Sequence, residues 1–122
     1  DREGGRVLAW QRINSTLPES RVSAECALAY ASDDVPMLAA RTIHPVPPTL
    51  GAPNPDIVMS ASLDHAIWFH REVPAEGWML YDLKAQGWTG GRGLAFGHVY
   101  APDGTHVASL AQEALVRERL SD

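Results

Sequence analysis

Apolar and polar positions along this chain form distinct patterns, and the changes of pattern divide the chain into the elements that we expect. Residues 6–13 (RVLAWQRI) mix apolar and polar positions as a half-buried strand does, and residues 14–20 (NSTLPES) have the composition of a turn. The pattern of the second half predicts a proline-rich loop over 44–55, one long strand over 56–71, a strand over 78–86, and two strands over 92–101 and 105–117. The last two strands flank Pro-Asp-Gly, which predicts a hairpin.

A helix is predicted between the first strand and the loop. Residues 20–35 are rich in alanine and contain no glycine, and Ser20 or Ser23 can cap the amino end. Pro36 lacks a backbone donor and disfavours helical geometry at Val35, so we expect the helix to end or bend there. One helix followed by antiparallel strands predicts an α+β domain with a sheet curved around a single helix.

Composition narrows the function classes. The chain has 122 residues, which fits one domain, and 45% of them are hydrophobic, which is too many for a disordered chain. The net charge of −5 argues against a nucleic-acid-binding protein, although a small basic patch for a phosphorylated ligand is compatible with it.

Targeting and redox features favour a cytoplasmic location. No signal peptide is visible, and no apolar run reaches the roughly 18 residues needed to cross a membrane. Cys26 is the single cysteine, so we expect no internal disulfide, and its apolar neighbours predict that it is buried. The chain opens without methionine, which suggests that it is part of a longer protein.

The segment 61–71 (ASLDHAIWFHR) carries most of the candidate chemistry. On a continuous strand, Ser62, Asp64 and His70 share one face and His65 lies on the other. This parity disfavours a Ser62–His65–Asp64 triad, and without a bulge the two histidines cannot bind one metal. The chain also has no GxSxG elbow, no HExxH motif and one cysteine, so neither a serine hydrolase nor a zinc site is indicated.

Two further segments are ambiguous from local chemistry. Residues 87–93 (GWTGGRG) are rich in glycine, but a strand follows where a P-loop needs a helix, so we interpret them as a turn, with Arg92 as a candidate contact for a ligand phosphate. Asp33 and Asp34 fall at the predicted carboxyl end of the helix, where negative charge is unfavourable. A functional role and simple turn chemistry are both compatible with this position.

The whole pattern resembles the carboxyl-terminal part of the type II acyl-CoA thioesterases, the TesB-like family. The resemblance extends over residues 25–117, and it rests on five segments: YASDD (30–34), SASLDHAIWFHR (60–71), GWMLYD (77–82), GRGLAFGHVYAPDGTHVAS (91–109) and LAQEALVR (110–117). It implies a hotdog fold, in which an antiparallel sheet wraps a central helix. Family members carry two such domains, so this chain is expected to be the second half of a double hotdog. Its partner would be an amino-terminal half or another copy in a homo-oligomer.

The resemblance also implies a site and a reaction. Asp33, Ser62 and Gln112 match the family positions that hold and activate one water, which hydrolyses an acyl-CoA thioester to a free fatty acid and CoA without cofactor or metal. Trp68 is expected in the core or in the wall of an acyl pocket, and Arg92 near the CoA phosphates. The alternative is a domain that binds acyl-CoA without hydrolysis or has only a structural role.

Overall fold

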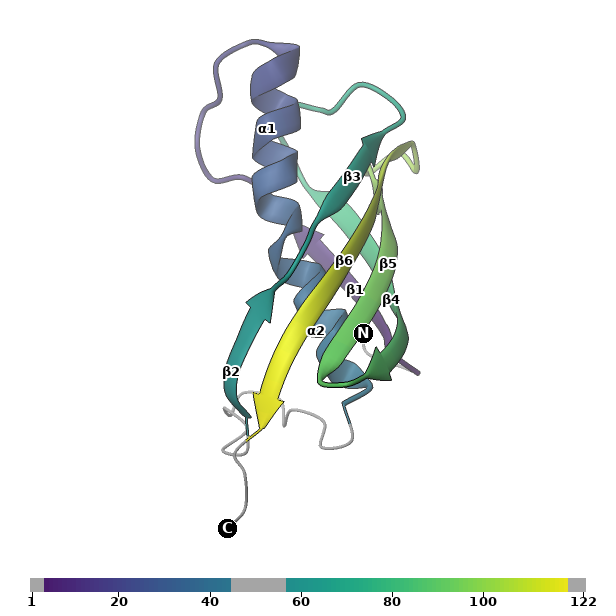
Figure 1. Ribbon diagram of the computed structural model, residues 1–122. Coiled ribbons are helices and arrows are strands. Elements are labelled where there is room, and N and C mark those ends of the chain that lie inside the picture. Colours follow the sequence, from purple (N-terminus) through teal and green to yellow (C-terminus); the bar gives the residue numbers. More distant parts are fainter. Residues whose placement is uncertain (1–3, 45–56, 119–122) are drawn as a thin grey trace.

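The structure, a computed structural model, describes residues 4–44 and 57–118 (Figure 1). The elements in chain order are β1 (Arg6–Gln11), α1 (Arg21–Ser32), α2 (Asp34–Thr42), β2 (Ile57–Ser62), β3 (Ala66–Phe69), β4 (Met79–Thr89), β5 (Arg92–Tyr100) and β6 (His106–Glu118). The strands form one antiparallel sheet in the order β1-β4-β5-β6-β2, and β3 also pairs with β6. The predicted α+β class is confirmed.

The helical segment is longer than predicted and is divided in two. Ser20 caps α1 as expected, because its hydroxyl accepts a hydrogen bond from the Ser23 amide at 3.0 Å. The helix does not end at Val35 but bends close to it, which is the second of the two expected outcomes. It breaks at Asp33 and continues as α2, with Pro36 in the first turn of the second helix. Proline is tolerated there because amides of a first turn have no partner within the helix.

The sheet curves around α2 rather than around α1. Figure 1 shows α2 against the sheet and α1 extending beyond it, and α2 contacts β1, β4, β5 and β6. Ala39 and Ala40 of α2 are fully buried, and a Cβ atom placed on Gly93 of β5 would lie 2.8 Å from the Ala40 Cβ. These small residues allow the close approach of helix and sheet. We call the sheet face toward α2 the inner face and the opposite one the outer face.

Both predicted turns between the last strands are present. The β5–β6 hairpin turns across 102–104, as expected. Gly90 and Gly91 connect β4 to β5 with φ of 59° and 72°, a conformation that favours glycine. The glycine-rich segment 87–93 is therefore a hairpin turn and not a phosphate loop.

Two other predictions are wrong. The continuous strand over 56–71 is interrupted at 63–65, which separates β2 from β3. Cys26 is exposed, because it lies off the face of α1 that buries Ala24 and Leu28. The proline-rich loop predicted over 44–55 falls outside the described residues apart from its first one, His44.

None of the helices described here has both the length and the apolar character needed to cross a membrane. Within residues 4–44 and 57–118, no group of three or more His, Cys, Asp or Glu side chains is arranged to bind a metal ion.

Candidate active site

A bulge between β2 and β3 decides which side chains face α2. Ser62 pairs with Ala114 of β6, whereas Ala66 pairs with Ala111. Residues 63–65 therefore lie opposite only two residues of β6, and this extra residue reverses the alternation of faces. As a result both Ser62 and His65 point to the inner face. The parity argument that separated them is wrong for this reason.

Gln112 is at the centre of the candidate site. Its side chain is 1% exposed and points inward from β6. The amide nitrogen lies 2.7 Å from the Ser62 hydroxyl oxygen and 3.1 Å from the Asp33 backbone oxygen, and the amide oxygen lies 2.6 Å from Nδ1 of His65. One buried side chain thus joins β6, β2 and the break between the helices.

The contacts fix the orientation of the Gln112 amide. A backbone carbonyl only accepts hydrogen bonds, so the atom that faces the Asp33 carbonyl must be the NH₂ group. The same nitrogen donates to Ser62, because an amide nitrogen is not an acceptor. The hydroxyl hydrogen of Ser62 is consequently directed away from Gln112 and is available to another acceptor.

Asp33 lies at the break between α1 and α2. It is exposed, and its side chain makes no capping hydrogen bond to α2. Asp33 ends α1, as predicted, but it also precedes α2 directly. The unfavourable position expected for Asp34 is wrong, because Asp34 lies in the first turn of α2, where the helix dipole favours negative charge. The free carboxylate of Asp33 borders a groove together with Ser62.

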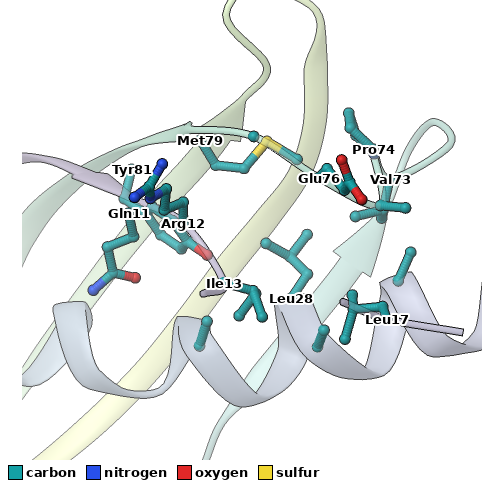
Figure 2. Close-up of a pocket in the computed structure, with 15 residues that line it drawn as sticks. Gln11, Arg12, Ile13, Leu17, Leu28, Val73, Pro74, Glu76, Met79 and Tyr81 are labelled. Atoms are coloured by element: carbon teal, nitrogen blue, oxygen red, sulfur yellow. The ribbon is translucent and has the colours of Figure 1, made fainter. Parts of the chain in front are cut away.

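The groove has a volume of about 590 Å³. Its wall consists of Gln11, Arg12, Tyr30, Ala31, Asp33, Asp34, Met37 and Ser62. A second, apolar cleft of about 30 Å³ lies between α1 and the ends of the strands and shares Gln11, Arg12 and Ala31 with the groove (Figure 2). That volume admits about one water molecule. We place the candidate chemistry in the groove, because only the groove is bordered by both Asp33 and Ser62.

Figure 2 shows Leu28 of α1 and Met79 of β4 on opposite sides of the apolar cleft. Tyr81 also lines it, and burial raises the pKa of the Tyr81 phenol to about 12. This tyrosine is therefore a neutral group near pH 7.

The two residues predicted to contact substrate lie elsewhere. Trp68 pairs with Ser109 on the outer face and is 53% exposed, so it is not a core side chain. Arg92 also lies on the outer face, with its guanidinium 3.6 Å from the carboxylate of Glu113. The structure does not bring either residue to the groove on the inner face. Phe69, in contrast, packs against the core.

The parity argument set His65 on the face opposite to Ser62 and so did not predict its contact with Gln112. Its ring joins Gln112 to Ser32, with 2.8 Å between Nε2 and the Ser32 hydroxyl. A polar Ser-x-Asp-His within an apolar segment was the available signal, but the register of the bulge cannot be read from one strand alone.

Comparison with known proteins identifies the family. The family model described as acyl-CoA thioesterase C-terminal domain matches residues 1–116. The chain belongs to this family. It is 34% identical over 109 residues to acyl-CoA thioesterase 2 of Haemophilus influenzae, covering 89% of the chain and 36% of that protein. It is 33% identical over 114 residues to mouse acyl-coenzyme A thioesterase 8, covering 92% of the chain and 33% of that protein.

A solved structure of a similar protein has the same fold as this domain. The acyl-CoA thioesterase II TesB2 of Mycobacterium marinum superposes with a TM-score of 0.80 at 35% identity, and the match covers 96% of this chain and 44% of that one. The hotdog fold expected for this thioesterase domain is confirmed. The domain spans about a third of the length of the curated relatives it matches.

Proposed function

We propose that this domain hydrolyses acyl-CoA thioesters to a free fatty acid and CoA with one water activated by a site of Asp33, Ser62 and Gln112, in which Gln112 holds Ser62 and does not contact the water. The observation that carries the proposal is the Gln112 amide, which links the Ser62 hydroxyl to the Asp33 backbone beside the groove. The names of the similar proteins support the substrate class. Ser62 and Asp33 act on the water itself, whereas Gln112 fixes the orientation of Ser62 by donating a hydrogen bond to its hydroxyl oxygen.

Ser62 orients the water. Its oxygen accepts from Gln112 at 2.7 Å, so its hydrogen is free to be donated to the water oxygen. The water then directs a proton toward the exposed carboxylate of Asp33 and a lone pair toward the thioester carbonyl. Holding the water in this geometry reduces the entropic cost of attack.

Asp33 acts as the general base, a role that contributes on the order of 10² to 10⁴-fold. It takes one proton as the water oxygen bonds to the carbonyl carbon. The tetrahedral intermediate then breaks its C–S bond, and the CoA thiolate recovers the proton from Asp33. The products are the carboxylic acid and CoA thiol, and the carboxylate of Asp33 is regenerated. Neither a metal nor an acyl-enzyme takes part in this scheme.

Arg12 is the cation that the groove offers to the CoA phosphates. It borders the groove, and its guanidinium lies 5.1 Å from the centre of the Trp78 ring. Arg92, predicted for this role, is separated from the groove by the sheet within one copy of the domain. Arg12 and Arg92 therefore make a pair of variants that distinguishes the two assignments by the KM for acyl-CoA.

A second hotdog domain is part of the proposal, supplied either by another segment of a longer protein or by another copy. The relatives are about three times as long as the matched region. Large apolar side chains are also exposed, among them Trp10, Trp68, Trp78 and Phe96, each 47% to 53% exposed. Such groups gather at interfaces between domains. Sedimentation of this 122-residue domain alone, at low micromolar concentration, tests this proposal. A monomer of the isolated domain that hydrolyses acyl-CoA would overturn it.

The decisive assay for the reaction measures thiol release from acyl-CoAs of several chain lengths. We expect release by the wild-type protein and its loss in Asp33→Asn. Binding of acyl-CoA without thiol release would instead favour the non-catalytic alternative.

A further inference from the structure

The His65 ring connects the candidate site to α1. Nδ1 lies 2.6 Å from the Gln112 amide oxygen, and Nε2 lies 2.8 Å from the Ser32 hydroxyl. Gln112 is 1% exposed and Ser32 is fully buried, so both ends of this connection are withdrawn from water. His65 does not border the groove that Asp33 and Ser62 line.

The position of one proton follows from these contacts. The Gln112 oxygen faces His65 and can only accept, so Nδ1 carries a hydrogen and donates it. In the neutral ring, Nε2 accepts from the Ser32 hydroxyl. In the charged ring, Nε2 donates to Ser32, whose hydrogen then goes to the Ala29 carbonyl at 2.9 Å. The bond from Nδ1 to Gln112 is present in both states.

From this geometry we propose that His65 is a positioning residue for the hydrolysis, which rests on the function proposed above. It holds the Gln112 amide with its NH₂ group toward Ser62 and Asp33. That orientation makes Ser62 an acceptor from Gln112 and leaves the Ser62 hydrogen for the water. His65 thus acts on the water through two intermediate side chains and touches neither water nor substrate.

Loss of His65 leaves the Gln112 oxygen buried without this partner. The Gln112 side chain then either binds a water molecule at this oxygen or moves to another position. In either case the Ser62 hydroxyl is no longer held in one orientation. We expect a fall in kcat of up to about 100-fold, the size of the loss when a group that positions a reactant is displaced by about 1 Å. KM is expected to change little, because His65 does not border the groove.

Two substitutions at His65 separate positioning from packing. Phenylalanine fills the space without a donor, whereas the side-chain nitrogen of asparagine lies near the place of Nδ1 and can donate to Gln112. We expect His65→Phe to lose kcat in the intact protein and His65→Asn to recover most of it. His70→Phe is the matched control, since His70 is exposed and contacts Ser109 rather than Gln112. This control should keep the wild-type kcat. Denaturation midpoints of all three variants establish that they fold.

A spectroscopic readout tests the contact without relying on activity. Nitrogen-15 NMR should show that the hydrogen of the neutral His65 ring is on Nδ1. A neutral ring with its hydrogen on Nε2 would overturn the proposal, and so would wild-type kcat in a folded His65→Phe protein when Gln112→Ala is impaired. Absence of thiol release from the wild-type protein would instead overturn the proposed reaction and, with it, the role of His65. Loss in His65→Phe with recovery in His65→Asn supports the proposal.

Discussion

Replacing Gln112 by alanine should weaken both the fold and the site. The side chain makes three hydrogen bonds, of 2.6, 2.7 and 3.1 Å, to His65, Ser62 and Asp33. A net contribution of about 0.5–1.5 kcal/mol per bond would give about 1.5–4.5 kcal/mol for the three bonds. Water from the adjoining groove can rehydrate Ser62, so we expect a loss near the lower end, about 2 kcal/mol. Urea denaturation measures this change in the free energy of unfolding.

Two control variants identify the source of the loss. Gln86→Ala removes the same group from an exposed position, where the amide makes only a 3.1 Å bond to the nearby Lys84 carbonyl, and should cost less than about 0.5 kcal/mol. Gln112→Met keeps most of the volume without the amide, so it separates lost packing from lost hydrogen bonds. If Gln112→Ala lowers the free energy of unfolding no more than Gln86→Ala does, the buried amide does not join the three elements and the reasoning fails.

Asp33→Asn should change the free energy of unfolding by less than about 1 kcal/mol, because the side chain is exposed and makes no capping hydrogen bond, so that only its interaction with the helix dipoles is lost. It should lower kcat by about 10² to 10⁴-fold in a thiol-release assay. Ser62→Ala and Gln112→Ala should lower kcat with a combined loss smaller than the sum of the separate ones, since Gln112 acts on the water through Ser62 and groups that act as a unit are not additive; additive losses would argue against this shared role. Intact-mass spectrometry during turnover should reveal no acyl adduct on Ser62, and a stable adduct there would replace the water mechanism by nucleophilic catalysis. The hydrogen bond from Arg6 holds the pKa of Asp82 below its usual range, so the stability that this pair contributes is present above the unfolded pKa of about 3.9 and is lost as pH falls through the lower folded value. Arg6→Ala should therefore reduce the acid sensitivity of unfolding below about pH 4, and an unchanged pH profile would contradict this.

The fold could be predicted largely because its signals are local. The Pro-Asp-Gly turn, the paired glycines at 90 and 91 and the Ser20 cap each act over a few residues, and each occurs in the structure as expected or as the favoured interpretation. The sequence left open whether the helix ends or bends near Val35, because a proline in a first turn and a proline that ends a helix look alike in a single sequence.

The arrangement of the site depends on pairing between distant segments. The bulge at 63–65 exists only in relation to β6, some fifty residues further along the chain, and no pattern within one strand reveals it. For that reason the faces of Ser62 and Trp68 were assigned wrongly relative to one another. The choice of Asp33, Ser62 and Gln112 came from resemblance to a family, and their roles stay predictions.

Because the helix breaks at Asp33, the position of the proposed base depends on the tilt of α1 relative to α2. α2 is packed into the curve of the sheet, whereas α1 extends beyond it, and the two helices meet at the residue that carries the proposed base. A tilt of α1 about this joint would displace the carboxylate relative to a Gln112 side chain anchored in β6. The bonds from Gln112 to the Asp33 carbonyl and from His65 to Ser32 resist such a tilt. These two bonds therefore fix the carboxylate of Asp33 relative to the Ser62 hydroxyl.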